Sequence, residues 1–472
     1  MKKTNSRYLL TLTGVATLGG LLFGYDTAVI SGTVGSLESF FVAPYGLSET
    51  AANSKLGMVV SSALIGCILG GIIGGWISRK LGRRNGLIAA ALLFLVSALG
   101  SSMPEMFFAK IGTGDHFFIN HFIFYRIVGG VGVGLASMLS PLYIAEIAPA
   151  EKRGGLVSLN QFAIIFGMLI VYFVNYFIAG QGDEAWLNAV GWRWMFASEV
   201  IPAGLFLILL LFVPDTPRSL VLKAKPEKAL NILTKVNGTT KAQVILKEIQ
   251  ETVTHRSDKL FSYGFKVILI GILLSVFQQF VGINVVLYYA PEIFKSMGSK
   301  TDSALLQTII VGSANLLFTI LAIVMVDKAG RKPLMIMGAL GMSLAMFALG
   351  TSFATHTVGL FSLICMLVYV ASFAMSWGPV TWVLLSEIFP NKIRGRAMAV
   401  AVAAQWISNY LVSWTFPMLD KDSFLIEKFN HGFAYWIYGL MALLATLLIW
   451  RFVPETKGKT LEEMEKIWKR QD

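Results

Sequence analysis

The sequence predicts an all-α integral membrane protein whose twelve transmembrane helices form two related halves. Three observations support this fold class. First, the 472-residue chain is 55% hydrophobic and only 14% charged, with a mean hydropathy of +0.67, whereas soluble chains carry roughly a quarter charged residues. Second, its apolar stretches approach or reach the roughly 20 residues that a helix needs to cross a bilayer. Third, short motifs in the first half of the chain recur in the second half.

The apolar segments form two sets of six on either side of a polar segment, 214–262. In that segment apolar residues recur at helical spacing among lysines, which favours short amphipathic helices over a solvated linker. We therefore expect a six-helix bundle in 1–213, linker helices in 214–262, a second bundle in 263–454 and a charged tail in 455–472. The predicted spans are 9–31, 55–78, 86–106, 118–143, 155–179, 192–213, 263–290, 304–326, 333–352, 358–386, 396–417 and 432–453.

The positive charges predict the orientation of the chain. Most of the 39 lysines and arginines fall in loops on one side when the spans are threaded alternately, and such loops face the cytoplasm. Both termini are therefore expected to be cytoplasmic, with the basic N-terminus leading into a permanent first helix rather than a signal peptide. Because the charge does not gather on one soluble face, nucleic acid is not an expected partner. The five scattered histidines have no ligand spacing, so we expect no metal.

Three motifs in the predicted cytoplasmic loops recur at nearly the same separation along the chain. Three collinear repeats imply a duplication, and each pair lies on the same side of the membrane. The halves are thus expected to be parallel repeats that hold substrate between them. The pairs are RKLGRR at 79–84 with DKAGRK at 327–332, EIAP at 146–149 with EIFP at 387–390, and VPDTP at 213–217 with VPETK at 453–457.

Charged side chains at these loops could close a cytoplasmic gate by pairing with neighbouring helices. Alternatively, the charges only set the topology. The spacing E-x-x-P-x-x-x-R-G, present in both halves, favours a gate. The candidate gate residues are Arg83, Glu146, Arg153, Asp327, Arg331, Glu387 and Arg394.

These motifs resemble those of the sugar porter family of the major facilitator superfamily, over essentially the whole chain. The resemblance implies the major facilitator fold. In one respect the chain departs from the family pattern: Arg79 occupies a position that is usually Asp, which weakens the gate hypothesis for the first half. The most specific motifs are PLYIAE at 141–146, PDTPR at 214–218, QQ at 278–279 followed by GIN at 282–284, and VPETKG at 453–458.

The resemblance also implies a function. Runs 19–34, 277–292 and 374–391 suggest a proton-coupled symporter that imports a pentose, D-xylose being the expected sugar, by alternating access. The expected location is the bacterial inner membrane, with the sugar, protons and the lipid bilayer as partners. We expect a monomer with no cofactor beyond the coupling proton.

Two acids, Asp26 and Glu199, and one arginine, Arg126, lie well inside predicted spans, away from the span ends. A charged side chain in the membrane costs a few kcal/mol, so Asp26 in the first span is expected to face the interior and to serve a purpose. Arg126 in the fourth span should lie at a similar depth. An acid that pairs with arginine and takes up a proton when the two separate would be a proton switch, and a static salt bridge is the alternative. Glu199 in the sixth span could join the proton relay.

A sugar site needs groups that both donate and accept hydrogen bonds, and rings that cover the C–H face of the sugar. An amide that faced lipid would lose its hydrogen bonds at a cost in free energy, so intramembrane amides should line a cavity. Each amide alone could instead only hydrogen-bond one helix to another. As a set they match the sugar-binding positions that the resemblance implies. The candidates are Phe23, Gln161, Gln278, Gln279, Asn284, Tyr288, Asn315, Trp382, Gln405 and Trp406.

The spacing of two of these amides predicts a broken helix. On a straight helix, Gln278 and Asn284 would be rotated by about 240° and could not share a face. Gly282 lies between them, so we expect the seventh span to break there. In the tenth span Pro379 and Pro390 suggest a second flexible element.

Three other functions were weighed against symport. A facilitative sugar carrier with the same site is disfavoured by Asp26 and Arg126. A transporter-like sugar receptor would be expected to have a longer cytoplasmic tail. A membrane enzyme would need a nucleophile and base, or a phosphate-binding loop, and the sequence offers no such pattern. The residues alone do not separate xylose from arabinose, galactose or glucose.

Overall fold

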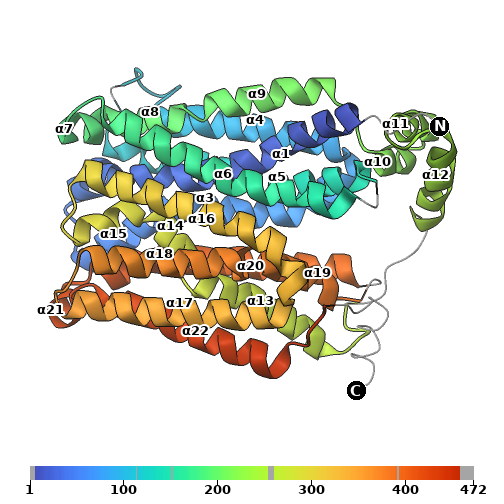
Figure 1. Ribbon diagram of the computed structural model, residues 1–472. Helices are drawn as coiled ribbons and strands as arrows, with labels where there is room; N and C mark the ends of the chain where they lie inside the picture. The colour runs from blue at the N-terminus through green and yellow to red at the C-terminus, as the bar shows by residue number, and fades with distance from the viewer. Residues whose placement is uncertain (1–5, 113, 150–151, 254–259, 391–392, 458–472) are drawn as a thin grey trace.

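The computed structural model describes residues 6–112, 114–149, 152–253, 260–390 and 393–457. Long helices lie side by side with roughly parallel axes, and the short helices α10–α12 lie outside the bundle at one end (Figure 1). We call this the α10–α12 end, and the opposite one the α21 end. Within the described residues, eleven helices are long and apolar enough to cross a membrane.

The first half contains six helical segments at the predicted places. The helix at the sixth place, Glu184–Phe212, is irregular and is interrupted at Ser198 and Glu199. The elements are α1 (Ser6–Val29), α2 (Val34–Leu37), α3 (Glu49–Lys80), α4 (Arg83–Ser102), α5 (Ile119–Ile147), α6 (Arg153–Ala179), α7 (Glu184–Trp186), α8 (Trp192–Ala197) and α9 (Val200–Phe212).

The second half repeats this arrangement, with two of its spans broken into shorter helices. The elements are α13 (Phe265–Phe280), α14 (Ile283–Tyr288), α15 (Ala290–Ser296), α16 (Thr301–Ala329), α17 (Arg331–Ala354), α18 (Leu360–Met375), α19 (Trp377–Ile388), α20 (Arg394–Asp420), α21 (Ser423–Phe429) and α22 (Gly432–Phe452).

The twelfth segment, α20, is not among the eleven apolar helices, although its 27 residues are long enough to cross a membrane. Its sequence is diluted by polar residues, of which Ser408, Asn409 and Ser413 are buried. Polar side chains inside a membrane protein are tolerated where protein rather than lipid surrounds them. The protein therefore has the twelve-helix fold, and α20 is one of the helices that furnish its polar interior.

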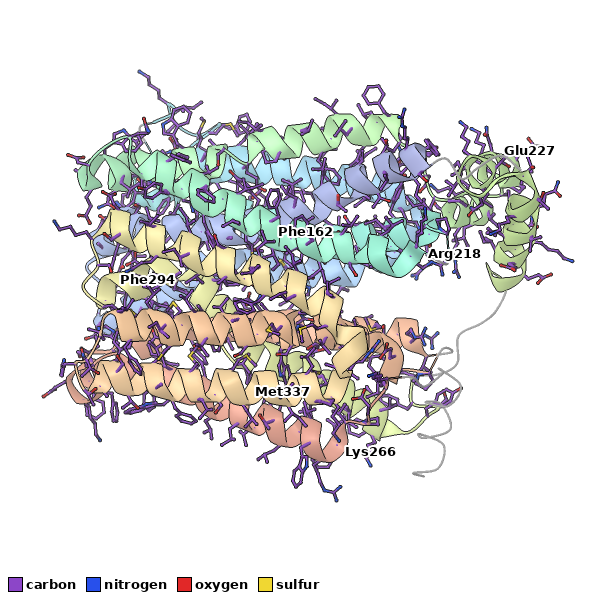
Figure 2. All side chains as sticks on the ribbon, in the orientation of Figure 1. Phe162, Arg218, Glu227, Lys266, Phe294 and Met337 are labelled. Carbon is purple, nitrogen blue, oxygen red and sulfur yellow. The ribbon has the colours of Figure 1, made fainter. Side chains whose placement is uncertain are left out.

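Three short helices follow the first half. They are α10 (Pro217–Leu222), α11 (Pro226–Asn237) and α12 (Thr239–Val253). Leu220, Ala229 and Ile232 form a small separate apolar cluster that holds them together. Arg218 of α10 and Glu227 of α11 lie at the same end of the molecule as the described start of α1 (Figure 2).

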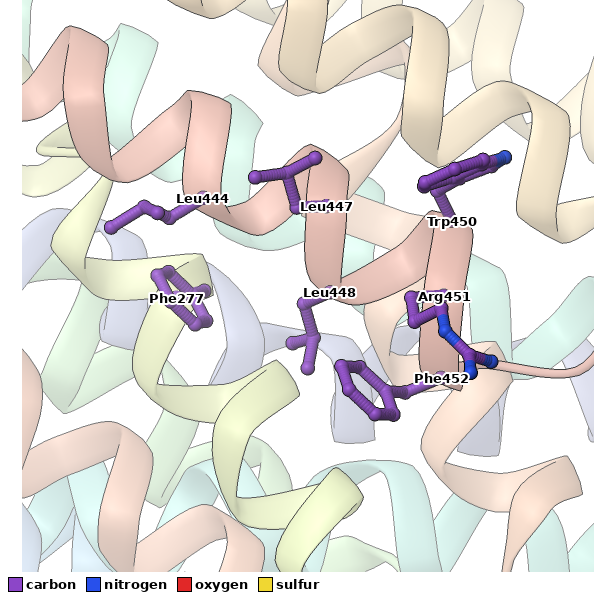
Figure 3. A pocket seen from close by; sticks show the side chains of 7 residues that line it. All are labelled: Phe277, Leu444, Leu447, Leu448, Trp450, Arg451 and Phe452. Atoms are coloured by element: carbon purple, nitrogen blue, oxygen red, sulfur yellow. The ribbon is translucent and has the colours of Figure 1, made fainter.

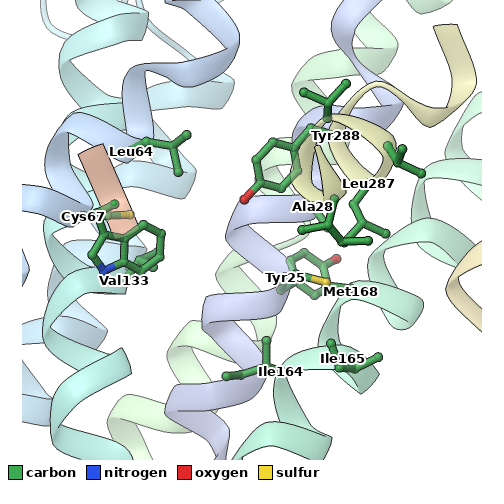
Figure 4. Close-up of a cluster of buried hydrophobic side chains, with 14 of the residues drawn as sticks. Tyr25, Ala28, Leu64, Cys67, Val133, Ile164, Ile165, Met168, Leu287 and Tyr288 are labelled. Atoms are coloured by element: carbon green, nitrogen blue, oxygen red, sulfur yellow. The ribbon is translucent and has the colours of Figure 1, made fainter. Parts of the chain in front are cut away.

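Close contacts at glycine set the spacing of helices around the centre. A methyl group on Gly24 of α1 would lie 1.9 Å from the carbonyl oxygen of Ile164 on α6. On α5, a methyl group on Gly130 would lie 1.8 Å from the carbonyl oxygen of Ala63 on α3. Small residues at such crossings let helix backbones approach closely in a membrane. The close approach brings α1, α3, α5 and α6 around one buried cluster that also receives Tyr288 of α14 (Figure 4).

Several polar contacts between the two halves lie toward the α21 end. Lys421, after α20, forms an ion pair with Glu38, after α2. The indole nitrogen of Trp414 on α20 donates to the carbonyl oxygen of Ser54 on α3 at 3.1 Å. These contacts tie the halves together at one end of the bundle.

Candidate functional site

The two oppositely charged residues predicted inside the first half form a buried ion pair. Arg126 Nη1 donates to Asp26 Oδ1 at 2.8 Å, and Nη2 donates to the Asp26 carbonyl oxygen at 3.1 Å. Their side chains are 1% and 0% exposed. The guanidinium also lies over the Phe196 ring, 5.2 Å from its centroid. The arginine therefore grips both the side chain and the backbone of α1.

Local sequence explains why Asp26 reaches this position. Gly24, two residues earlier, allows α1 to approach α6, as described above. Opposite the carboxylate lies Gly129 of α5, where a methyl group would lie 3.2 Å from Asp26 Oδ1 and 2.2 Å from Ser97 Oγ. A larger residue at Gly129 would crowd the acid. The glycines thus make room for a charged pair that lipid could not solvate.

Glu199 lies beside this pair, at the break between α8 and α9. It is fully buried and neighbours both Asp26 and Arg126. The Tyr25 hydroxyl lies 2.7 Å from Ser198 Oγ and so links α1 to the same break. Both carboxyl oxygens of Glu199 and Oδ2 of Asp26 receive no hydrogen bond from a described protein donor, and the two carboxyl groups face each other. All three residues predicted for proton coupling therefore meet in one buried cluster.

The seventh span breaks where the sequence predicts. α13 ends at Phe280, Gly282 has a φ of +91°, and α14 begins at Ile283. Glycine alone adopts this left-handed conformation readily, and a methyl group there would lie 2.7 Å from the Tyr438 ring. The break lets Asn284 Nδ2 donate to Gln279 Oε1 at 2.6 Å.

The tenth span also breaks, but not at the predicted proline. α18 ends at Met375 and α19 begins at Trp377, with Ser376 between them at φ −132° and ψ −87°. Pro379 lies in the first turn of α19, where a missing N–H group costs no helical hydrogen bond. The tenth span is thus interrupted three residues before Pro379, and α19 ends at Ile388, two residues before Pro390. The Trp377 carbonyl at the break accepts from Gln278 Nε2 at 2.8 Å.

The candidate sugar residues gather only in part. Phe23 of α1 and Trp406 of α20 lie with ring centroids 5.6 Å apart, so each half contributes one ring. Gln278 Oε1 and Gln405 Oε1 are buried acceptors without a described protein donor. Gln279 and Asn284 are linked to each other by the hydrogen bond described above. Among the described residues, no hydrogen bond or ring contact connects Gln161, Asn315 or Trp382 to another candidate.

Two further polar residues belong with these candidates but were not singled out from the sequence. Asn409 of α20 and Thr27 of α1 lie next to the buried Tyr288 hydroxyl of α14. Asn409 is an intramembrane amide one helical turn after Gln405, so the criterion applied to the other amides would have found it. Thr27 carries no comparable signal, because threonine is common inside membrane helices.

Gate candidates in the first half form a compact network at the α10–α12 end. Arg83 Nη2 donates to Glu146 Oε1 at 2.7 Å, and Thr216 Oγ1 donates to Glu146 Oε2 at 2.5 Å. Asp215 Oδ1 accepts from the backbone N–H groups of Arg83, at 3.0 Å, and Arg84, at 3.1 Å. Burial would raise the pKa of Asp215, but hydrogen bonds from Ser219, Lys223 and the Arg84 backbone hold that pKa below its ordinary value.

The second half builds the same network from the repeated motifs. Arg331 Nη2 donates to Glu387 Oε1 at 3.0 Å, and Thr456 Oγ1 donates to Glu387 Oε2 at 2.6 Å. Glu455 takes the place of Asp215 and accepts from the backbone N–H groups of Arg331 and Lys332. Burial would raise the pKa of Glu455, but these N–H groups and those that follow it lower the pKa below its usual range. The sequence repeat is thus also a repeat of contacts.

Both of these ion pairs between gate candidates join residues of the same half. Arg153 is exposed, and Arg394 donates to the Phe389 carbonyl oxygen at 3.3 Å. The Asp327 side chain lies outside the described residues. The networks therefore stabilise each half at the α10–α12 end, while the ties described above join the halves toward the α21 end.

A separate hollow of about 390 Å³ lies between α13 and α22 (Figure 3). Apart from Arg451 its lining is hydrocarbon and aromatic: Phe277, Leu444, Leu447, Leu448, Trp450 and Phe452. Such a lining cannot satisfy the several hydroxyl groups of a sugar. The polar residues near the centre of the molecule remain the candidate site.

Comparison with known proteins identifies the family of this chain. The family model "Sugar (and other) transporter" matches residues 12–468. The "D-xylose-proton symporter" of Escherichia coli (strain K12) is 62% identical over 473 residues, which cover 98% of this chain and 96% of the relative. The "Glucose facilitated diffusion protein" of Zymomonas mobilis is 44% identical, with 100% of both chains covered.

A solved structure, the inward open conformation of the xylose transporter XylE from E. coli, matches with a TM-score of 0.89 and 60% sequence identity. The match covers 98% of this chain and all of that one. The resemblance inferred from the motifs is therefore confirmed, and the chain belongs to the sugar transporter family of the major facilitator superfamily.

Proposed function

We propose that this protein is a proton-coupled symporter that imports D-xylose by alternating access across the bacterial inner membrane. The observation that carries the proposal is the buried cluster of Asp26, Arg126 and Glu199. A relative covering nearly the whole chain is named a D-xylose-proton symporter.

The charge balance of this cluster suggests how a proton is used. Two buried carboxyl groups beside one guanidinium leave one negative charge without a counter-charge, and a proton bound to either acid removes that excess. Protonation of Asp26 weakens the grip of Arg126 on α1, because the 2.8 Å contact is then no longer an ion pair. When the contact between α1 and α5 is weaker, these helices can move relative to each other. The first half can then change its shape as the sugar site passes from facing one side of the membrane to facing the other.

The sugar is proposed to bind between the halves, near the two helix breaks. Gln278, Gln279 and Asn284 come from the α13–α14 break, and Gln405 comes from α20. Trp406 and Phe23 supply ring faces from opposite halves. The remaining sugar candidates, Gln161, Tyr288, Asn315 and Trp382, complete the proposed lining. A site whose parts come from both halves senses their relative position, which alternating access requires.

The α10–α12 end is assigned to the cytoplasm because the positively charged loops gather there. The ties between the halves toward the α21 end support a state that is closed to the outside. We propose the domain limits 1–213, 214–262, 263–454 and 455–472, both termini in the cytoplasm, and a monomer as the working unit.

A facilitative carrier is the second candidate, because one relative with full coverage is named a glucose facilitated diffusion protein. The test is uptake of labelled D-xylose into proteoliposomes with and without an imposed pH gradient. Accumulation above the external concentration, only with the gradient, supports symport. Uptake that stops at equal concentrations in both cases would establish facilitated diffusion instead. Competition by arabinose, galactose and glucose tests the sugar.

A further inference from the structure

The loop between α4 and α5 exposes large apolar side chains at the α21 end. Phe107 is 85% exposed, Phe108 67%, Ile111 56% and Phe117 67%. Soluble loops rarely gather so many exposed apolar residues, and an exposed apolar group of this kind marks an interaction site. None of these side chains belongs to the proton cluster, which consists of Asp26, Arg126 and Glu199, or to the candidate sugar site.

The loop leaves the bundle sideways, beside α8 and across the direction of the helix axes (Figure 1). It therefore extends over the flank of the first half, not over the end where the halves meet. The adjoining flank is also apolar: Leu99 of α4 is 41% exposed and Phe124 of α5 is 60% exposed. In a membrane protein such a flank faces lipid, and the loop continues this surface outward.

The loop is held in shape by a buried carboxylate. Glu105 is fully buried, accepts from Arg193 Nη1 at 2.8 and 2.9 Å, and accepts from the Gly112 N–H at 2.7 Å. This bond between residues 105 and 112 closes the loop, and Phe107 within it has a φ of +75°. A bulky residue in this left-handed conformation is unfavourable. The N–H groups of Phe108 and Ala109, which both donate to the Glu105 carbonyl oxygen at 2.9 Å, hold the turn around Phe107.

We propose that residues 106–112 form an anchor that lies in the bilayer interface of the leaflet at the α21 end. Phenylalanine and aliphatic side chains insert at the boundary between lipid headgroups and acyl chains, while a lysine keeps its charge at the headgroups; Lys110 lies among the exposed apolar residues in the sequence. The occupant of this surface is phospholipid, because the anchor continues the lipid-facing flank of α4 and α5. It holds the first half at a fixed depth while the second half moves.

The test uses fluorophores attached to single cysteines in proteoliposomes. The two native cysteines, Cys67 and Cys365, are buried, so added cysteines can be labelled selectively. Ile111→Cys reports on the anchor, and Glu427→Cys, an exposed polar position of α21 at the same end, is the control. Each label is quenched either by a phospholipid with a nitroxide near its headgroup or by iodide in water.

The expected result is strong lipid quenching and weak iodide quenching at Ile111→Cys, with the opposite pattern at Glu427→Cys. Adding Phe107→Ser and Phe108→Ser should shift the first label toward the control pattern without loss of xylose uptake. The proposal is overturned if the Ile111→Cys label behaves like the control. It is also overturned if both quenchers fail until the protein is diluted in the vesicles, because a second copy of the chain would then cover the loop.

Discussion

Replacing Asp26 by Asn tests the proton cluster most directly. The change removes one negative charge but keeps a side-chain oxygen that can accept from Arg126 Nη1, which now donates at 2.8 Å. We expect sugar to cross the membrane down its gradient but no longer to be accumulated. The reason is that the carboxyl group proposed to alternate between arginine and a proton is gone.

The size of the effect follows from the coupling. With one proton per sugar, a gradient of one pH unit supplies about 1.4 kcal/mol, which accumulates sugar about tenfold. The expected ratio for Asp26→Asn is about 1. Arg126 is 1% exposed, and a buried pair that loses one partner is destabilised by about 3–5 kcal/mol. Because the amide oxygen of the new asparagine can still accept from Arg126, we expect Asp26→Asn to lower the free energy of unfolding by about 3 kcal/mol or less.

The assay compares accumulation with counterflow exchange, which needs no proton gradient. The double variant Asp26→Asn with Arg126→Met removes both charges of this ion pair, leaves Glu199 in place, and controls for stability. We expect it to regain thermal stability and still fail to accumulate sugar. If the pair were only a static salt bridge, this double variant would accumulate xylose normally. Tenfold accumulation by Asp26→Asn itself would refute the proton switch.

Three further predictions concern other parts of the molecule. Gln278→Ala should weaken xylose binding by roughly tenfold or more, because the change removes a buried amide whose oxygen has no protein donor. Unchanged affinity in an equilibrium binding assay would exclude Gln278 from the sugar site. Glu146→Gln should lower the Tm in detergent more than Glu387→Gln, because the first acid is 8% exposed and the second 26%; equal shifts would contradict this ranking. His431 lies outside the spans, and its hydrogen bond with Asp420 raises its pKa above 6.5. The stabilisation that protonated His431 gives the folded protein is therefore complete below pH 6.5 and is lost as pH rises through the raised pKa. The Tm difference between the wild type and His431→Gln should be largest near about pH 5.5 and smallest near about pH 9. A difference that is constant with pH would rule out this linkage.

Features of the chain that depend on local sequence could be predicted well. The length of an apolar stretch decides whether it can cross a bilayer, so the twelve segments and their order follow from hydropathy. The duplicated motifs predicted the two halves, and the repeated pairs Arg83–Glu146 and Arg331–Glu387 show the same contacts twice. The break at Gly282 followed from the angle between two amides.

Tertiary structure decided which groups meet. A membrane helix is apolar on its lipid face and on its packed face, so its sequence does not reveal which way a polar residue points. Packing placed the tenth-span break at Ser376, where the Trp377 carbonyl can accept from Gln278. Packing also brought Glu199 next to Asp26 and turned the aromatic residues around Phe108 outward. The sequence alone predicted the order of the twelve segments and identified the family, because both are recorded along the chain. The buried cluster of Asp26, Arg126 and Glu199, the break at Ser376 and the proposed anchor depend on rotations and crossings of helices that only the folded structure defines.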